Sequence, residues 1–308
     1  MKFLKAMIAH RTWTYGISLV CILAAFLALS VWGLRLGMDF TGGTLMEVDW
    51  TASTTAPTKD AVLTKVTPLN LQSLSVQETE RGVILRYGSS DEDLNQKVLG
   101  ELRTLDATLQ IVRSDFVGGA VSADMQRNAL WGVTFSIIGI LLYIAWAFRG
   151  VSFPISSWEY GVGAAIALAH DILITCGVFA ALGHFYGVEI GIPFIAALLT
   201  ILGYSVNDTI VVYDRIRENL TKSSHSESFP AIVNRSLLET LGRSINTSVT
   251  VVIVLVALVV LGGEGVRWFA VALLTGVVFG TYSSIFVASA LLVTRFLSKP
   301  DLVKAEKV

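Results

Sequence analysis

Charged side chains are scarce in this sequence. Only 15% of the 308 residues are Asp, Glu, Lys or Arg, while 53% are hydrophobic. A soluble globular domain normally carries about 25% charged residues. The formal net charge of -1 also excludes the broad basic field that draws a protein to nucleic acid. The composition therefore predicts a chain whose main solvent is the lipid bilayer.

Cysteine is nearly absent as well. Cys21 and Cys176 each lie in an apolar run, where cysteine behaves as a small hydrophobic residue. We therefore expect neither a disulfide nor a metal site. The sequence offers no nucleophile motif, metal-ligand spacing or phosphate loop, which argues against hydrolytic activity and against a cofactor.

Long apolar runs, in contrast, recur along the whole chain. About 20 such residues cross a bilayer, which predicts six transmembrane helices at residues 13–34, 129–148, 161–182, 190–213, 245–262 and 268–296. Lys2, Lys5 and Arg11 precede the first run, but that run is longer than the apolar core of a signal peptide. We interpret it as a retained anchor.

Basic residues in the short connections predict the orientation of the chain. With the N-terminus inside, the inner segments contain Arg149, Arg215, Arg217, Lys222, Arg235, Arg243, Arg295, Lys299, Lys304 and Lys307, whereas the short outer turns contain Arg267. This asymmetry follows the positive-inside rule. It places residues 1–12, the loop 214–244 and the tail 297–308 in the cytoplasm, and residues 35–126 in the periplasm or outside the cell.

The outside segment, residues 35–126, has the pattern of a small α+β domain. We predict strands at residues 44–50, 71–79, 83–87 and 109–116, with a turn at Arg81-Gly82, and helices at 58–66 and from Ser89-Ser90-Asp91 to about residue 105. The order βαββαβ is typical of a ferredoxin-like fold. The expected fold class is a multi-pass α-helical membrane protein with this domain between helices 1 and 2.

Paired glycines stand at both ends of the outside segment. Gly42 and Gly43 follow Asp39 after the first span, and Gly118 and Gly119 precede the second. Glycine permits backbone conformations closed to other residues, and the first pair lacks the lysine and following helix of a phosphate loop. We interpret both pairs as structural junctions, and bending at them during function is a hypothesis.

An ionisable residue inside the fourth apolar run is the most informative single feature. Asp208 shares one helix face with Thr200 and Tyr204 at a spacing of four, and Asn207 lies beside that face. A charge near the middle of a bilayer costs about 2.5–3.5 kcal/mol, so such a residue usually marks a proton or ion pathway. The alternative is a carboxylate that only hydrogen-bonds a neighbouring helix.

Arg243 is the cation that we expect near Asp208. It begins a polar face of the fifth span, formed with Asn246, Thr247 and Thr250. Burial raises the pKa of a carboxyl group and a nearby cation lowers it, and a site that loads and releases protons needs both effects. The alternative is an arginine that extends to the inner membrane surface as an anchor.

Asp171, on the third span, is a second candidate for the proton pathway, with interhelical hydrogen bonding as the alternative. Its neighbour His170 is a weaker candidate. Adjacent residues on a helix point about 100° apart, so we do not expect the two side chains to share a partner.

Three further segments have structural interpretations. Residues 213–219 carry mixed charges, which favours a solvated helix end over a docking site for a partner. Residues 229–239 have the pattern of an amphipathic helix lying on the inner membrane surface. Gly276 and Gly280 have the spacing that permits close packing of helices, within the chain or against a partner.

Four motifs carry a family resemblance. They are Asp39-Phe-Thr-Gly-Gly43, Ala169-His-Asp171, the run from Gly203 to Asn219, and Arg243-Ser-Ile-Asn-Thr-Ser248. Together they resemble the SecF subunits of the SecD/SecF protein-export family, within the resistance-nodulation-division superfamily. The resemblance spans nearly the whole chain. The motif on the fourth span is highly specific, whereas the first motif also occurs in SecD.

The resemblance implies a subunit that lies in the bacterial cytoplasmic (inner) membrane, where it contacts lipids and pairs with SecD. There it would use the proton-motive force to help move preproteins outward after SecA has fed them through SecYEG, with YajC and YidC as further partners. Asp208 and Arg243 match the proton-pathway residues of the family, and some members use sodium instead of protons. Two alternatives stay open: half of a proton-coupled exporter of small molecules or lipids, and a passive scaffold of the translocon.

Overall fold

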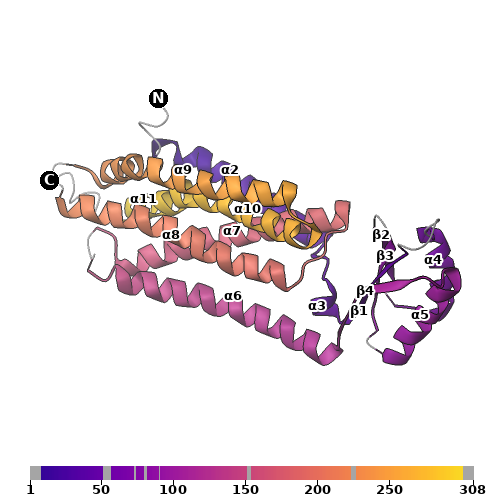
Figure 1. The fold of residues 1–308 in the computed structure, drawn as a ribbon. Coiled ribbons are helices and arrows are strands. Elements are labelled where there is room, and N and C mark those ends of the chain that lie inside the picture. The colour runs from indigo at the N-terminus through magenta and orange to yellow at the C-terminus, as the bar shows by residue number, and fades with distance from the viewer. Residues whose placement is uncertain are drawn as a thin grey trace. The chain divides into compact units, whose positions relative to one another are not determined.

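The computed structural model of the chain describes residues 8–50, 57–72, 74–79, 82–89, 91–150, 154–222 and 227–300 (Figure 1). The chain divides into two compact units, one of residues 36–130 and one that contains the rest. Six residues used in the sequence analysis lie outside the described residues: Lys2, Lys5, Arg81, Ser90, Lys304 and Lys307.

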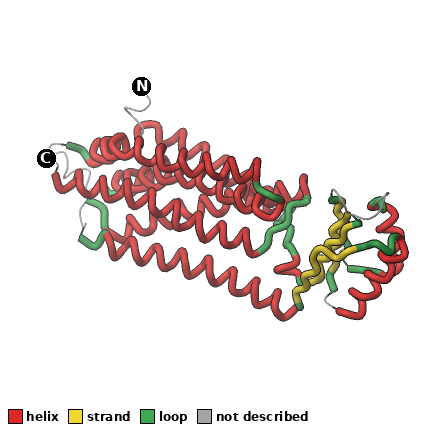
Figure 2. Tube along the Cα trace, in the orientation of Figure 1, coloured by secondary structure: helices red, strands yellow, loops and turns green. Residues whose placement is uncertain are grey.

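The smaller unit contains a four-stranded antiparallel sheet and short helices (Figure 2). Its elements are α3 (Met38–Thr41), β1 (Gly43–Asp49), α4 (Lys59–Val66), η2 (Thr67–Leu69), β2 (Ser75–Glu78), β3 (Gly82–Tyr87), α5 (Glu92–Leu105) and β4 (Gln110–Val117). The strands are ordered β2-β3-β1-β4. This confirms the predicted α+β domain, although β2 is shorter than the strand expected at residues 71–79.

The core of this unit forms between the sheet and the two longer helices. Val62 of α4 and Leu102 of α5 are fully buried against Val48 and Leu85 of the sheet. Asp91 caps α5 as predicted, because its carboxylate accepts a hydrogen bond from the Asp93 amide at 3.1 Å. The helices therefore contribute their apolar stripes to a single core.

The two glycine pairs differ in backbone geometry. Gly42 and Gly43 have φ angles of 72° and 126°, in the region that favours glycine. A Cβ atom at Gly43 would lie 2.4 Å from the carbonyl oxygen of Tyr87. Gly118 and Gly119 have no positive φ in the described chain, and a Cβ atom at either one would meet nothing within 4 Å. A strict need for glycine is therefore confined to the first pair.

The larger unit is a helical bundle. Among the described residues, six helices are long and apolar enough to cross a membrane, which confirms the predicted multi-pass class. They are α2 (Arg11–Val31, preceded by η1, Ile8–His10), α6 (Gly119–Ala147), α7 (Ser157–Tyr186), α8 (Ile192–Lys222), α9 (Phe229–Leu261) and the run of α10 (Glu264–Ser283), η3 (Ser284–Ala288) and α11 (Ser289–Leu297). Helices α7, α8, α9 and α10 lie side by side (Figure 1).

The inner connection predicted at residues 214–244 is mostly helical, and its helices are continuous with the two spans that it joins. Helix α8 continues to Lys222 and α9 begins at Phe229, so most of this segment is helical. Residues 229–239 are the first turns of α9 and form no separate surface helix. Their apolar face, with Phe229 and Leu237, is buried in a cluster with Tyr213 and Phe296. The amphipathic pattern reflects packing against protein, not lipid.

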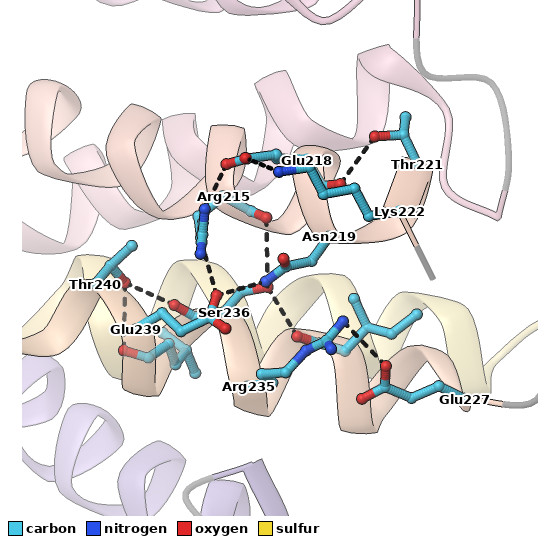
Figure 3. A network of polar contacts seen from close by, with 12 residues as sticks. Arg215, Glu218, Asn219, Thr221, Lys222, Glu227, Arg235, Ser236, Glu239 and Thr240 are labelled. Atoms are coloured by element: carbon cyan, nitrogen blue, oxygen red, sulfur yellow. Dashed lines mark hydrogen bonds and ion pairs between the residues drawn. The ribbon is translucent and has the colours of Figure 1, made fainter. Parts of the chain in front are cut away.

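A polar network joins α8 to α9 beyond this cluster (Figure 3). The Asn219 side chain donates hydrogen bonds to Ser236 Oγ at 2.9 Å and to Glu239 Oε2 at 2.7 Å. The Arg215 guanidinium lies 2.6 Å from the same Glu239 carboxylate. Residues 213–219 are therefore more than the solvated helix end that we predicted, because one side of this segment holds α9 in register with α8.

Small residues bring α10 close to α8. A Cβ atom at Gly276 would lie 2.2 Å from a side-chain carbon of Ile201, and one at Gly280 would lie 3.0 Å from Cβ of Ser205. Gly276, Gly280 and Ser284 follow one row along α10 into η3 at a spacing of four. The close approach that the glycine spacing predicts occurs here inside the chain.

We predict that Gly276→Ala weakens the bundle by about 1–3 kcal/mol, because the added methyl group overlaps Ile201 in a packed interface. The measurement is the thermal unfolding midpoint of the full chain in detergent micelles. Gly139→Ala is the matched control, because a Cβ atom at that position of α6 meets nothing within 4 Å. Equal midpoints for the two variants would contradict the close packing.

We also predict that Asn219→Ala lowers the unfolding midpoint in the same assay, because the buried Ser236 and the Glu239 carboxylate lose a donor. The expected loss in the free energy of unfolding is about 1–3 kcal/mol. Arg217→Ala is the control. Its guanidinium is half exposed and lies 3.8 Å from Asp214, and an exposed pair of this kind contributes about 0–1 kcal/mol. A larger effect of the Arg217 variant would show that the network does not hold the helices.

Candidate functional site: two buried carboxylates

Asp208 lies on α8 inside the bundle, with 7% of its surface exposed. Its carboxylate accepts a hydrogen bond from Ser244 Oγ of α9 at 2.5 Å and another from Ser284 Oγ at the start of η3. Among the described residues, no ion pair reaches this carboxylate. Three helical elements therefore meet at Asp208, and uncharged hydroxyl groups satisfy it.

Asp171 of α7 is fully buried at a second site of similar construction. Ser205 Oγ of α8 lies 2.6 Å from its Oδ2 atom, and Ser283 Oγ of α10 lies 2.7 Å from the same oxygen. The other carboxylate oxygen lies 2.9 Å from Nδ1 of His170. Each carboxylate is thus held by two serines that come from neighbouring helices.

His170 contacts Asp171 itself, an arrangement that the sequence argument about a shared partner did not address. Although the two Cα–Cβ bonds diverge, the imidazole ring turns back and makes the 2.9 Å contact with its neighbour. Nε2 of His170 is buried and has no hydrogen-bond partner in the described part of the chain.

Two consecutive serines connect the sites. Ser283 ends α10 and contacts Asp171, while Ser284 begins η3 and contacts Asp208. η3 is a π-helical turn, in which one extra residue widens the helix locally, and such turns are frequent at functional sites. On α8, Ser205 and Asp208 are three residues apart. Helix α8 and the run of α10 and η3 therefore each contribute to both sites.

Tyr204 belongs to a hydroxyl chain beside the carboxylates. Its phenol donates a hydrogen bond to Ser248 Oγ at 3.0 Å, and Ser248 Oγ lies 2.6 Å from Oγ1 of Thr281. Ser284 Oγ also donates to the carbonyl oxygen of Thr281 at 3.0 Å. A row of hydroxyl groups therefore runs beside Asp208 and includes Tyr204, whose ring packs in an apolar cluster with Leu255 and Val277.

Within the described residues no ion pair joins Arg243 to Asp208, and the pairing that we expected stays a prediction. The Arg243 side chain is exposed and lines a pocket of about 440 Å³ with Asp214, Arg217 and Glu239, among others. The next residue, Ser244, is the one that faces Asp208. Adjacent positions on a helix diverge by about 100°, so only one of the two can point at α8.

Polar residues beside Arg243 share its exposed face. Asn246, Thr247 and Thr250 are exposed on α9, as are Thr200 and Asn207 on α8. Thr200 donates to the carbonyl oxygen of Ala196 in its own helix. The structure thus divides the predicted site: Asp208 and Asp171 lie inside the bundle, Tyr204 is half-buried, and Asn207 and Arg243 face outward.

The sequence reasoning missed the serines that hold the carboxylates. Ser244 was visible only as the residue after Arg243, and Ser284 only as a small residue in the glycine row. A usable signal existed, because Ser283, Ser284 and Ser289 interrupt an otherwise apolar run. Hydroxyl groups inside membrane helices commonly hydrogen-bond across to a neighbouring helix.

Comparison with known proteins identifies the family. Residues 97–297 match the family model "Protein export membrane protein SecD/SecF, C-terminal", and residues 28–49 match the "SecD/SecF GG Motif". The chain is 42% identical to protein translocase subunit SecF of Thermobaculum terrenum over 298 residues, covering 91% of this chain and 90% of the relative. It is 39% identical to SecF of Vibrio alginolyticus, covering 93% and 88% respectively.

Solved structures agree with this assignment. The crystal structure of SecDF from Thermus thermophilus is similar with a TM-score of 0.77 and 33% sequence identity. SecDF in its super-membrane-facing form is similar with a TM-score of 0.66 and 31% identity, covering all of this chain. The chain covers 38% and 40% of the two SecDF chains, and it therefore corresponds to part of each. By these matches, the chain belongs to the SecD/SecF family of protein-export membrane proteins, as a SecF-type translocase subunit.

Proposed function

We propose that this subunit pairs with SecD and converts the proton-motive force into movement that promotes preprotein translocation across the bacterial cytoplasmic membrane. The observation that carries the proposal is the environment of Asp208, a carboxylate buried in the bundle and held by hydroxyl groups of two other elements. An ionisable group kept in a membrane-spanning segment at a cost of several kcal/mol is a functional site by default.

The uncharged partners of Asp208 make a change of ionisation feasible. An ionised carboxylate accepts both serine hydroxyls, whereas a protonated one carries a hydrogen that must itself be donated. Gain of a proton lets Ser244 or Ser284 accept that hydrogen and turn its own hydroxyl to another acceptor, as the Thr281 carbonyl oxygen near Ser284 Oγ provides. Because these serines belong to α9 and η3, the rearrangement acts on the packing of two elements against α8.

The exposed polar face supports pairing with SecD. Thr200 and Asn207 on α8, and Arg243 and Asn246 on α9, are exposed on helices of otherwise apolar character. Polar and charged groups inside a membrane normally face a protein interior or a water-filled cavity. We propose that SecD covers this face and supplies the carboxylate for Arg243, since this chain covers less than half of the SecDF chains it resembles.

The proposed orientation has both termini in the cytoplasm and residues 36–130 in the periplasm. The basic residues of α8 and α9 near Lys222 and Arg235 would then lie at the cytoplasmic surface, as the positive-inside rule requires. In this arrangement the subunit acts beside SecYEG, with YajC and YidC, after SecA has delivered the preprotein. It has no hydrolytic activity of its own, and its motion follows from two states that differ in proton affinity.

We predict that Asp208→Asn abolishes the part of preprotein translocation that depends on the proton gradient, because the amide cannot exchange a proton. Assembly with SecD should be retained. Arg243→Ala should give a similar loss, because the SecD carboxylate that we propose as the partner of Arg243 would lose its cation. The measurement is preprotein import into inverted membrane vesicles that contain SecYEG, SecA and ATP, with and without a gradient.

Asp214→Asn is the matched control for this test, because it removes an exposed carboxylate from the same helix. It should leave the gradient-dependent import unchanged. If both the Asp208 and Arg243 variants import preprotein normally, the subunit is a passive scaffold and the proposal is refuted.

The glycine junction yields a separate prediction about movement of the periplasmic unit. Gly43→Ala should reduce gradient-dependent import, because a Cβ atom at a φ of 126° is strained and lies 2.4 Å from the Tyr87 carbonyl oxygen. Gly118→Ala, where a Cβ atom meets nothing within 4 Å, should import normally. Equal import by the two variants would remove the junction at Gly42 and Gly43 from the mechanism.

A further inference from the structure

The π-helical turn η3 occurs where the two carboxylate sites meet. In a regular α-helix, consecutive side chains diverge by about 100°. Ser283 and Ser284 use this divergence to reach two different helices, α7 through Asp171 and α8 through Asp208. A single peptide unit thus joins the two serines that hydrogen-bond the two buried carboxylates.

The carbonyl groups of the widened turn are bonded by side chains from several places. Ser289 Oγ donates to the Ser284 carbonyl oxygen at 3.1 Å, five residues away. The Tyr213 hydroxyl of α8 donates to the Ala288 carbonyl at 3.2 Å, and Thr14 Oγ1 of α2 lies 3.4 Å from the Phe286 carbonyl. Side-chain donors of this kind satisfy the backbone groups that an irregular turn leaves free inside a membrane.

We propose that Ser283, at the end of α10, and Ser284, at the start of the π-helical turn, are positioning residues that make the ionisation of Asp208 and the ionisation of Asp171 depend on each other. Ser284 holds Asp208, Ser283 holds Asp171, and a shift of the backbone at either serine moves the other. A proton gained at one carboxylate therefore changes the hydrogen bonding of the second.

Helix α8 provides a second connection between the two carboxylate sites. Ser205, which donates to Asp171, is one helical turn before Asp208 on the same face. A change in the packing of α8 at Asp208 therefore reaches Asp171 as well. The two carboxylates share both helices, and two interacting groups of this kind titrate as a pair and not as separate sites.

The other ionisable groups near this pair are few. His170 contacts Asp171 from the same helix, and Arg243 precedes Ser244 on α9 but is exposed. On α10, Tyr282 directs its hydroxyl to the carbonyl oxygen of Thr14 at 2.7 Å. On α8, Tyr204 bonds Ser248. Within the described chain, serine hydroxyl groups thus contact both carboxylates, whereas His170 contacts Asp171.

The test is a pH titration of the full chain, assembled with SecD in lipid bilayers, by solid-state NMR of ¹³C-labelled aspartate carboxyl groups. Asp208→Asn and Asp171→Asn assign the two signals. Ser284→Ala should move the titration midpoint of Asp208 to higher pH by about one unit, because the ionised form loses a donor. Ser284→Thr keeps the hydroxyl and should restore the original midpoint.

Dependence between the sites is measured in the same titrations. Asp171→Asn should shift the Asp208 midpoint in the native background, and this shift should become smaller when Ser283→Ala is also present, because only the connection through Ser205 then remains. Ser289→Ala touches neither carboxylate but removes a donor to the π-helical turn, and it should shift both midpoints. Thr275→Val is the control, because that half-buried hydroxyl of α10 donates to the carbonyl oxygen of Val271 in its own helix and contacts neither carboxylate.

An Asp208 midpoint that is the same in the native chain, in Ser284→Ala and in Asp171→Asn would overturn the proposal. The inference rests on the proposed function for its biological meaning, but the NMR readout does not require export. If Asp208→Asn abolishes gradient-dependent import while the midpoints stay independent, the coupling is wrong and the function stands. If the midpoints are coupled while Asp208→Asn imports normally, the coupling stands and the proposed function is wrong.

Discussion

The burial of two carboxylates in a membrane-spanning bundle is the constraint on which the rest of the structure depends. Each carboxylate must receive hydrogen bonds inside the protein, because lipid supplies none. Ser244 and Ser284 satisfy Asp208, and Ser205 and Ser283 satisfy Asp171. Four helices must therefore converge within the short reach of a serine side chain.

The packing of α10 on α8 follows from that short reach. A serine hydroxyl contacts a carboxylate on another helix only when the two backbones lie close together. Gly276 and Gly280 allow this approach, because any larger side chain would overlap Ile201 or press on Ser205. The glycine row and the carboxylate sites therefore depend on each other. Gly276 and Gly280 set the distance between the backbones of α10 and α8, and at this distance Ser283 and Ser284 reach the carboxylates.

The ends of α8 and α9 stabilise the packing of these two helices, whereas their central parts hold the carboxylate sites. Around Asn219 and Glu239, charged groups bond to one another across α8 and α9 (Figure 3), and the aromatic rings of Tyr213 and Phe229 pack in the adjoining cluster. These contacts keep Ser244 of α9 opposite Asp208 of α8. A stable frame at one end leaves the hydroxyl contacts at the centre free to change with ionisation.

Much of the fold could be predicted because its signals are local. The length of each apolar run determined the spans, and the change of hydrophobic period determined the βαββαβ order of the smaller unit. The helix ends were less predictable. Residues 229–239 have the pattern of a surface helix, yet their apolar face packs on α8 and α11, and periodicity alone cannot tell a lipid partner from a protein one.

The sequence by itself determined that Asp208 and Asp171 lie in membrane helices, because a charged residue in a long apolar run is recognisable without a structure. Only the tertiary structure decided what holds them. Arg243 and Ser244 are neighbours in the chain, and the rotation of α9 about its axis placed the serine against Asp208 and the arginine outside. That rotation depends on packing with α8 and α10, which residues far apart in the sequence create together.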